Sequence, residues 1–327
     1  MNKKLVNVNN IDALAHYNIT KIVVAIGVFD GVHRGHQALL KKLQKMAKDH
    51  DATAVVMTFY PHPRAVLNSK TTPKLIIDNE ERKLELLSSY GINTVITIPF
   101  NNNFAKLSAE EFIQNCLLSH DVQICGLCVG SKWRFGAKGK GTITDLHEFA
   151  DAGHFEFEAQ DEIFYGEIEI SSSEIRRLIP NGEFHVVEEL LGRPYELSGE
   201  VVKGFQIASS QLGFATANID AKNSIIPPNG VYAARAIITT ESGKSKAYPA
   251  AVNIGLAPTF NLLDGDTARV EAHLLDFVEQ DLYGDDIRLE FLAYLREERT
   301  FADVQQLKEQ ISLDVNQVKN IYQKKFK

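Results

Sequence analysis

The chain has 327 residues, 44% of them hydrophobic and 24% charged, which is the balance of an ordinary globular protein. Its net charge of −7 at pH 7 disfavours general binding to nucleic acid, and because it contains no run of about 18 apolar residues we expect no membrane span. The first residues lack the apolar core of a signal peptide, and three cysteines in a chain of this length fit the reducing cytoplasm better than a disulfide scaffold.

Residues 1–20 are expected to add a strand and a short helix before the first strong pattern of the sequence. Residues 22–26 form an apolar, β-branched run that predicts a buried parallel strand. Gly27, Gly31 and Gly35 then interrupt the run and favour a tight turn. The apolar residues that follow are spaced as one face of a helix: Leu39, Leu40, Leu43 and Met46.

Two histidines, His33 and His36, lie where this turn meets the predicted helix. Being three residues apart, they can share one side of the helix start, whose free N–H groups and partial positive charge favour an anion. Two imidazoles beside that end suit phosphate binding and the stabilisation of charge during phosphoryl or nucleotidyl transfer. No lysine follows as in a Walker loop. The alternative is that both histidines merely occupy a surface turn.

Further segments continue the alternation of strands and helices. Residues 52–59 predict a strand that runs into a loop, in which Pro61 and Pro63 hold the chain extended around His62. The remaining segments are a strand at 95–100, a strand at 124–130, a helix at 79–90, and a helix at 108–118 that Ser108 caps. This alternation predicts a doubly wound parallel sheet, which binds its ligands at the carboxyl ends of the strands.

Cys125 and Cys128 form a CxxC within the last of these strands. A zinc site needs two further ligands at suitable spacing, and Cys116 does not complete one. We therefore interpret these cysteines as structural side chains of a buried strand.

Two polar segments follow the predicted sheet. Residues 131–142, rich in Gly, Lys and Arg, form either a solvated flexible loop or a mobile loop whose cations meet phosphates. In residues 170–179 a run of serines can cap a helix that places Arg176 and Arg177 in its first turns, where arginine can grip phosphate.

From Tyr195 the pattern changes to short strands between Gly, Asn and Asp turns, which predicts a small antiparallel barrel. The tail from Phe301 predicts one long helix whose apolar stripe packs on the barrel: Val304, Leu307, Ile311, Val315, Val318 and Ile321. The predicted fold class is therefore α/β. A doubly wound, Rossmann-like parallel sheet in residues 1–182 is followed in residues 183–327 by a small antiparallel β-barrel with a C-terminal helix.

A series of motifs extends over nearly the whole chain. The first half contains GVFDGVHRGHQ, TFYPHP, RFGAKGKG and SSSEIR, and the second contains LGRPYELSGEVVKG, LGFATANI, PPNGVYA, VNIGLAPTF, VEAHLLDF and DLYG. In their order and spacing the chain resembles the bacterial bifunctional riboflavin kinase/FMN adenylyltransferase family, the FAD synthetases. The resemblance implies riboflavin, FMN and ATP as small-molecule partners, while the charge and composition predict no nucleic acid, no membrane and a location in the cytoplasm. It leaves open whether the chain forms oligomers.

For the first domain the resemblance implies a nucleotidyltransferase that joins FMN and ATP into FAD and releases pyrophosphate. His33 and His36 would stabilise the transferring phosphates, and Arg176 would hold the phosphates of ATP together with Ser172 and Ser173. The remaining residues implied in cofactor binding are the motif residues Gly27, Phe29 and Gly35, and Phe59, His62 and Pro63, which would line the FMN or phosphate pocket.

For the second domain the resemblance implies a riboflavin kinase that makes FMN from riboflavin and ATP. Thr216 and Asn218 would bind Mg²⁺ and ATP, and Gly204 is also among the implied cofactor-binding residues. Glu271 would take the proton from the ribityl hydroxyl, a role that needs a carboxylate within hydrogen-bond reach. Without the family pattern, a lone glutamate on a strand is better interpreted as a solvated surface residue.

The sequence departs from the family pattern near phosphate or flavin contacts. Lys132 and Trp133 stand where an acidic or amide residue and Phe are usual, Ala208 and Ser209 where Gly and Arg are usual, and Ala215 replaces Pro. The altered kinase loop predicts that the second activity is the weaker one, through poorer ATP binding. These changes leave two alternatives, an adenylyltransferase with a degenerate kinase domain and a weakly catalytic, flavin-binding regulatory paralogue.

Overall fold

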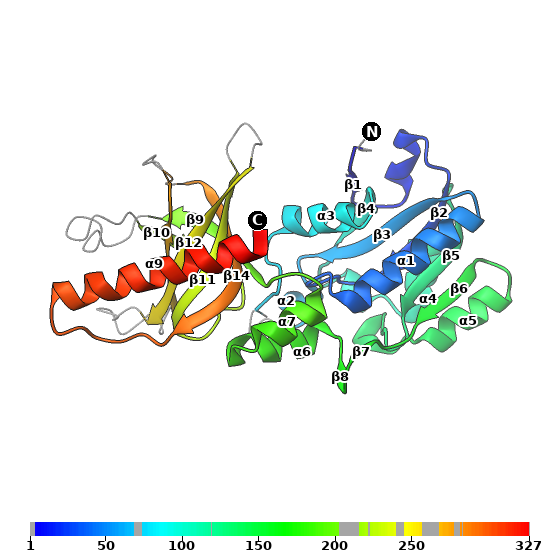
Figure 1. Ribbon diagram of the computed structural model, residues 1–327. Coiled ribbons are helices and arrows are strands. Elements are labelled where there is room, and N and C mark those ends of the chain that lie inside the picture. Colours follow the sequence, from blue (N-terminus) through cyan, green and yellow to red (C-terminus); the bar gives the residue numbers. More distant parts are fainter. Residues whose placement is uncertain are drawn as a thin grey trace. The chain divides into compact units, whose positions relative to one another are not determined.

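The structure is a computed structural model that describes residues 4–68, 74–118, 120–202, 216–221, 223–239, 245–256, 268–277, 282 and 284–326. The chain divides into two compact units (Figure 1). The first contains Met1–Pro73 and Glu80–Ser172, and the second contains Lys74–Asn79 and Ser173–Lys327. The domain limits 1–182 and 183–327 stay a prediction, since the second compact unit already begins at Ser173.

The first unit is built on a six-stranded sheet in which every neighbouring pair of strands is parallel, as predicted. The strand order is β1-β4-β3-β2-β5-β6. The strands are β1 (Val6–Val8), β2 (Lys21–Ile26), β3 (Thr53–Tyr60), β4 (Thr94–Pro99), β5 (Gln123–Gly130) and β6 (Glu156–Gln160). A short hairpin of β7 (Phe164–Tyr165) and β8 (Ile168–Glu169) follows.

Helices cover both faces of this sheet, which confirms the doubly wound fold. Helix α1 (Arg34–Asp49) packs against β2, β3 and β5 (Figure 1). The apolar face predicted for this helix is buried. The other face carries a core that includes side chains of η1 (Asp12–Tyr17), α4 (Ala109–Ile113) and α5 (Ile143–Asp151). The helical elements that remain are α2 (Pro63–Leu67), α3 (Glu80–Ser89), η2 (Phe104–Lys106), the π-helical turn Gln114–Leu118 and η4 (Ala137–Gly139).

The ends of several elements agree with the predicted signals. Ser108 accepts a hydrogen bond from the backbone of Glu111 and Glu111 reaches back to Ser108, so a capping box begins α4. Cys128 is fully buried in β5, as predicted for a structural cysteine. The extended loop predicted around His62 is wrong, because Pro63 begins a short helix, α2 (Pro63–Leu67), and proline favours the first helical position.

Local contacts hold the segment 131–142 together, and the choice between a solvated loop and a phosphate-binding loop stays a prediction. Phe135 and Gly141 form a bridge around η4, and the Trp133 ring stacks on Phe135 at 4.8 Å. Lys132 pairs with Glu169 at 2.9 Å and with a second carboxylate, so its charge is already compensated within the protein.

The second unit is a closed barrel of six antiparallel strands, as predicted. The closed order is β10-β13-β12-β11-β14-β9. The strands are β9 (Glu196–Val202), β10 (Thr216–Asp220), β11 (Gly230–Thr239), β12 (Ser245–Leu256), β13 (Ala268–Leu274) and β14 (Asp286–Arg296). The helices are α6 (Ser172–Leu178), whose first residue still belongs to the first unit, α7 (Phe184–Leu191) and α9 (Val304–Phe326).

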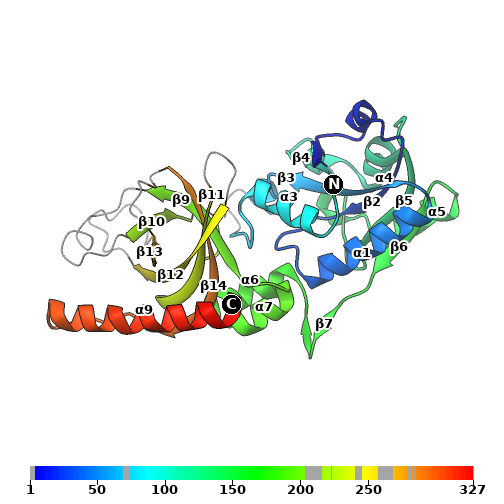
Figure 2. The ribbon, with the colours of Figure 1, turned by 45° about the horizontal axis from the view of Figure 1, so that its top comes forward.

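The long helix α9 lies along β11, β12 and β14 on the outside of the barrel (Figure 2). Val318 is fully buried there, with Val315 and Ile321 beside it, as the apolar stripe predicted. The prediction is wrong for Val304, which is 51% exposed. Within the described part of the chain, none of the helices combines the length and apolar character needed to cross a bilayer.

Candidate functional sites

The first candidate site is the loop between β2 and α1, whose backbone conformation is unusual. Phe29 and Val32 have φ of 55° and 39°, and Gly31 has φ of 86°. Positive φ is costly for side chains other than glycine, and above all for a β-branched valine, so such a conformation persists only where its surroundings impose it.

Hydrogen bonds from neighbouring elements impose that conformation. Thr58 of β3 donates its hydroxyl to the carbonyl of Val28 at 3.1 Å, and Gln37 of α1 donates its amide to the carbonyl of Val32 at 2.9 Å. Neither side chain belongs to a predicted site, and Thr58 lies 30 residues from the carbonyl it holds.

Ser172, predicted to hold phosphates of ATP, makes a third contact of this kind. Its hydroxyl donates to the carbonyl of Asp30 at 2.8 Å. A serine has a single O–H donor. In this geometry the donor is therefore used to anchor the loop, and the role of Ser172 toward ATP stays a prediction.

The two predicted histidines come together at the start of α1. His33 caps the helix, and its Nδ1 accepts the backbone N–H of His36 at 3.3 Å. The rings stack at 3.7 Å, and the Phe29 ring lies 5.0 Å from that of His36. Since Nδ1 of His33 accepts a hydrogen bond, the proton of its neutral ring lies on Nε2, which is then a donor.

Gly35 is required beside this pair. A Cβ at position 35 would lie 3.1 Å from the His33 ring and 3.2 Å from the carbonyl oxygen of Ile170. We expect Gly35→Ala to lower the rate of the reaction at this loop by about tenfold, because small displacements of positioned groups are costly. Gly130→Ala is the matched control, since a Cβ there meets nothing within 4 Å. FAD formation by both variants measures the effect, and equal rates would contradict it.

The predicted pocket residues Phe59, His62 and Pro63 follow the carboxyl end of β3. Phe59 is buried against Phe100 and Phe104, each with its ring centre 5.9 Å away. His62 caps α2, and its Nδ1 accepts the backbone N–H of the residue after Pro63 at 3.1 Å. The structure thus gives these residues an aromatic surface at the strand edge where parallel sheets bind ligands.

The remaining predicted residues of the first site, Ser173 and Arg176, lie on α6 within the second compact unit. The neighbouring Arg177 is engaged by Glu174, at 2.6 Å, on the exposed side of the helix. Gly27 lies against the Phe29 ring, which a Cβ at position 27 would approach to 3.1 Å.

The second candidate site lies on the outer face of the barrel. Asn218 of β10 pairs in register with Glu271 of β13, and Thr216 pairs with His273. Directly opposed residues in an antiparallel pair share a face, so the predicted residues Thr216, Asn218 and Glu271 lie together. Ala272 is fully buried and faces the barrel interior, so Glu271, the next residue along the strand, faces outward.

Arg269 fixes the orientation of this group, and the sequence analysis missed it. Its guanidinium forms a salt bridge with Glu271, and its Nε donates to Oδ1 of Asn218 at 3.2 Å. Alternate residues of a strand face the same side, so positions 269, 271 and 273 of β13 share one face. This alternation is the sequence signal that could have identified Arg269.

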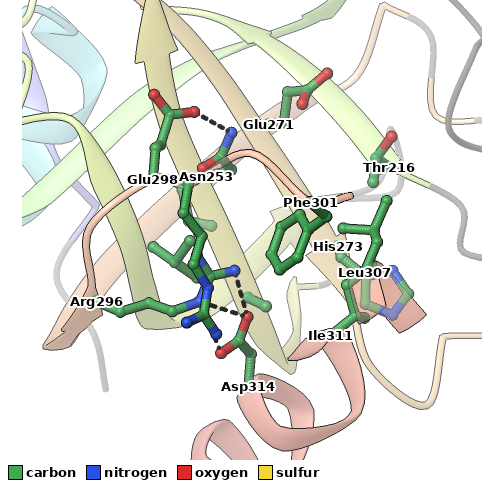
Figure 3. Close-up of a pocket in the computed structure, with 14 residues that line it drawn as sticks. Thr216, Asn253, Glu271, His273, Arg296, Glu298, Phe301, Leu307, Ile311 and Asp314 are labelled. Atoms are coloured by element: carbon green, nitrogen blue, oxygen red, sulfur yellow. Dashed lines mark hydrogen bonds and ion pairs between the residues drawn. The ribbon is translucent and has the colours of Figure 1, made fainter. Parts of the chain in front are cut away.

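Glu271 and Thr216 open into a cavity of about 320 Å³ beside the barrel (Figure 3). Polar groups surround its rim, among them Glu298, which accepts a hydrogen bond from Asn253 at 2.9 Å. Its apolar wall includes residues from the barrel, from the segment after β14 and from α9: Val231, Val252, Phe301, Leu307 and Ile311. Leu307 and Ile311, predicted to pack on the barrel, thus face this cavity (Figure 3).

A buried ion pair ties α9 to the barrel at the cavity. Arg296 at the end of β14 holds Asp314 of α9 through both carboxylate oxygens, the shortest contact being 2.8 Å. The side chains are only 19% and 6% exposed. Removing one charge therefore leaves the other buried without its partner.

We expect Asp314→Asn to destabilise the second unit by about 3 kcal/mol, the scale observed when one partner of a buried pair is lost. Asp276→Asn is the control, because Asp276 and its partner Lys319 have side chains that are 67% and 40% exposed. Such an exposed pair contributes under about 1 kcal/mol to the free energy of unfolding. Calorimetric melting of the full chain compares the two. Equal shifts in melting temperature would show that the buried pair of Arg296 and Asp314 stabilises the second unit no more than the exposed pair of Lys319 and Asp276 does.

Mg²⁺ is implied for the second site, and the side chains there suit it. Thr216 offers a hydroxyl, and the amide oxygen of Asn218, which accepts a hydrogen bond from Arg269, offers its second lone pair. Mg²⁺ prefers such hard oxygen ligands and commonly completes its shell with water and substrate phosphates. In the part of the chain that the structure describes, no three His, Cys, Asp or Glu side chains are grouped to hold a metal. Gly204 lies outside the described residues, as do Ala208, Ser209 and Ala215 of the altered loop.

Two families match the two halves of the chain, FAD synthetase over residues 16–174 and riboflavin kinase over residues 191–322. A bifunctional riboflavin kinase/FMN adenylyltransferase of Bacillus subtilis is 35% identical over 295 residues, covering 90% of each chain. The protein of that name from Escherichia coli K12 is 35% identical and covers 89% of this chain and 90% of its own. A crystal structure described as a macrolide-efflux protein from Streptococcus pneumoniae is 28% identical, with a TM-score of 0.80 over 97% of this chain and 99% of its own. The chain therefore belongs to the bifunctional riboflavin kinase/FMN adenylyltransferase family.

Proposed function

We propose that the first unit transfers the AMP group of ATP to FMN and that the barrel unit transfers the γ-phosphoryl group of ATP to riboflavin. The observation that carries the proposal is that one chain holds a stacked histidine pair at a helix start and a strand glutamate beside a cavity. Both are the reactions of the family to which the chain belongs, so one protein converts riboflavin to FMN and FMN to FAD.

In adenylyl transfer, a phosphate oxygen of FMN attacks the α-phosphorus of ATP. The bond from that phosphorus to the bridging oxygen of the β-phosphate breaks, and pyrophosphate leaves. Negative charge grows on the oxygens around the α-phosphorus, and preorganised donors placed there lower the barrier. We assign this role to His33 and His36, whose ring positions are supported by the helix start and by Phe29. No covalent intermediate on the protein is needed.

In riboflavin phosphorylation, a ribityl hydroxyl attacks the γ-phosphorus of ATP, and ADP leaves. The hydroxyl loses its proton, which we assign to Glu271 as the accepting carboxylate. The cavity beside it has the apolar wall and the few polar groups that a flavin ring and its ribityl chain need. Thr216 and Asn218 would hold Mg²⁺, which when bound neutralises phosphate charge.

Incubating the purified chain with riboflavin and Mg·ATP, and separating the flavins by chromatography over time, tests both activities. FMN should appear first and then convert to FAD, and FMN given alone with ATP should yield FAD. FAD from FMN without FMN from riboflavin would favour the degenerate kinase. Binding of flavin with neither product would favour the regulatory paralogue.

We also place the protein in the cytoplasm. Cys116, Cys125 and Cys128 are free thiols. Burial raises the pKa of Cys128 to about 12 and that of Cys116 to about 11, so both stay protonated and unreactive at neutral pH.

A further inference from the structure

One arginine of β13 contacts two of the side chains that are assigned to the kinase reaction. The guanidinium of Arg269 forms a salt bridge with Glu271, two residues further along the same strand. Its Nε also donates to Oδ1 of Asn218, on the neighbouring strand β10, at 3.2 Å. The mechanism proposed above uses Glu271 and Asn218 and gives Arg269 no part.

The register of the barrel strands explains how one side chain reaches both partners. Asn218 pairs directly with Glu271, so position 269 lies diagonally across from Asn218, within reach of a long side chain. On its other flank Arg269 pairs with Gly255 of β12, so no side chain at that position stands beside it. The guanidinium can therefore lie along the strands and bridge two elements of the site.

The contact with Asn218 selects one of two orientations of its amide. A side-chain amide has an oxygen end and a nitrogen end, and only the oxygen can bind Mg²⁺. The last torsion of asparagine is broad, so the bond itself selects neither end. Arg269 is a donor without an acceptor, and its contact fixes the orientation in which the oxygen of Asn218 faces β13.

The contact with Glu271 holds one carboxylate oxygen. The salt bridge uses Oε1. Across the residues that the structure describes, no hydrogen bond or ion pair takes Oε2 of Glu271, so this oxygen is available to accept a proton. A base that is held at one oxygen keeps the other in a defined place, and such placement accounts for much of the rate of a positioned group.

We propose that Arg269 is a positioning residue for the phosphorylation of riboflavin, which orients the base Glu271 and the metal ligand Asn218 with a single guanidinium. The inference rests on the roles proposed for these two residues. Arg269 itself need touch neither the substrates nor the metal. A lysine would not replace it, because a single ammonium on a flexible stem lacks the rigid fork of N–H donors.

The experiment compares two charge-preserving exchanges in the full chain, Arg269→Lys and Arg235→Lys. Arg235 is the matched control, because it is similarly exposed, pairs with the strand glutamate Glu290 at 3.3 Å and does not line the cavity. Arg269→Lys should lower kcat for FMN formation by at least about tenfold, as for the loss of a partner that orients a metal ligand. KM for riboflavin and FAD formation from FMN should match the control. Equal kcat in the two variants overturns the proposal.

A double variant separates positioning of the base from general support of the barrel. At saturating Mg²⁺, Arg269→Lys acts on kcat through Glu271, so it should cost under about threefold in a chain that already carries Glu271→Gln. If the exchange lowers kcat by the same factor with and without Glu271→Gln, Arg269 does not act through the base, and the proposal is wrong.

Binding of ADP at a series of Mg²⁺ concentrations, measured by calorimetry, tests the contact with Asn218 without turnover. Arg269→Lys should need about tenfold more Mg²⁺ than Arg235→Lys for half of the Mg²⁺-dependent gain in affinity. Any ADP bound in the first unit is common to both chains. An equal Mg²⁺ requirement overturns this half of the proposal.

Two further outcomes are also decisive. If the wild-type chain forms no FMN, the proposed function fails, and the Mg²⁺ titration still decides whether Arg269 orients Asn218. If Arg269→Lys does not fold, Arg269→Gln takes its place and is judged by the same comparisons.

Discussion

Replacing Glu271 by glutamine should abolish most phosphorylation of riboflavin while leaving the barrel folded. Glutamine keeps the size of the side chain and its hydrogen bonding, including an oxygen that Arg269 can still contact. It cannot accept a proton, and a positioned general base commonly contributes a hundredfold or more. We therefore expect kcat for FMN formation to fall by at least about a hundredfold, with conversion of FMN to FAD unchanged in the same preparation.

Glu290→Gln provides the matched control. Glu290 is also a half-buried strand glutamate of the barrel, paired with Arg235 at 3.3 Å, but it does not line the cavity. Phosphorylation by this variant should stay near wild type. If Glu271→Gln phosphorylates riboflavin as fast as Glu290→Gln does, Glu271 is not the base.

His36→Ala should lower FAD formation by at least about a hundredfold, the scale of losing one positioned donor to developing charge. The exchange also removes the ring that stacks on His33 at 3.7 Å, so the remaining imidazole loses part of its support. Riboflavin phosphorylation should be nearly unchanged, since Glu271 and its cavity belong to the second unit. FMN consumption and FAD appearance measure the first activity, and FMN formation from riboflavin the second.

His154→Ala controls for the loss of a histidine from the same unit, because His154 is exposed beyond α5. It should leave both activities intact. Equal loss of both activities in folded His36→Ala would show that the histidine acts on the whole protein rather than at one site.

The strands and helices of the first unit could be predicted because local signals there agree with tertiary packing. Residues 22–26 are apolar at every position, and the structure buries them between helices on both faces of the sheet. The serine at 108 and the glutamate three residues later specify a helix start by themselves. The barrel register likewise follows from alternation along its strands, which places Glu271 outward and Ala272 inward.

The conformation of the histidine loop could not be predicted, because long-range contacts impose it. Positive φ is expected at a glycine such as Gly31 but not at Phe29 or Val32, whose side chains disfavour that conformation. Ser172, which holds the loop from 142 residues away, was interpreted through its family position instead. The ion pairs of Lys132 could not be predicted for a similar reason, since its carboxylate partners lie 30 or more residues further along the chain.

The pairing of β9 with β14 has a consequence for the order in which the protein matures on the ribosome. The barrel closes only when its last strand, ending at Arg296, reaches its first, and the cavity gains Leu307 and Ile311 later still. All residues of the first unit have been synthesised once translation has passed Ser172. Because domains tend to fold in the order of their synthesis, the adenylyltransferase unit of the nascent chain can fold before the kinase unit is complete. A premature stop just before Val304 should therefore yield a protein that makes FAD from FMN but no FMN from riboflavin.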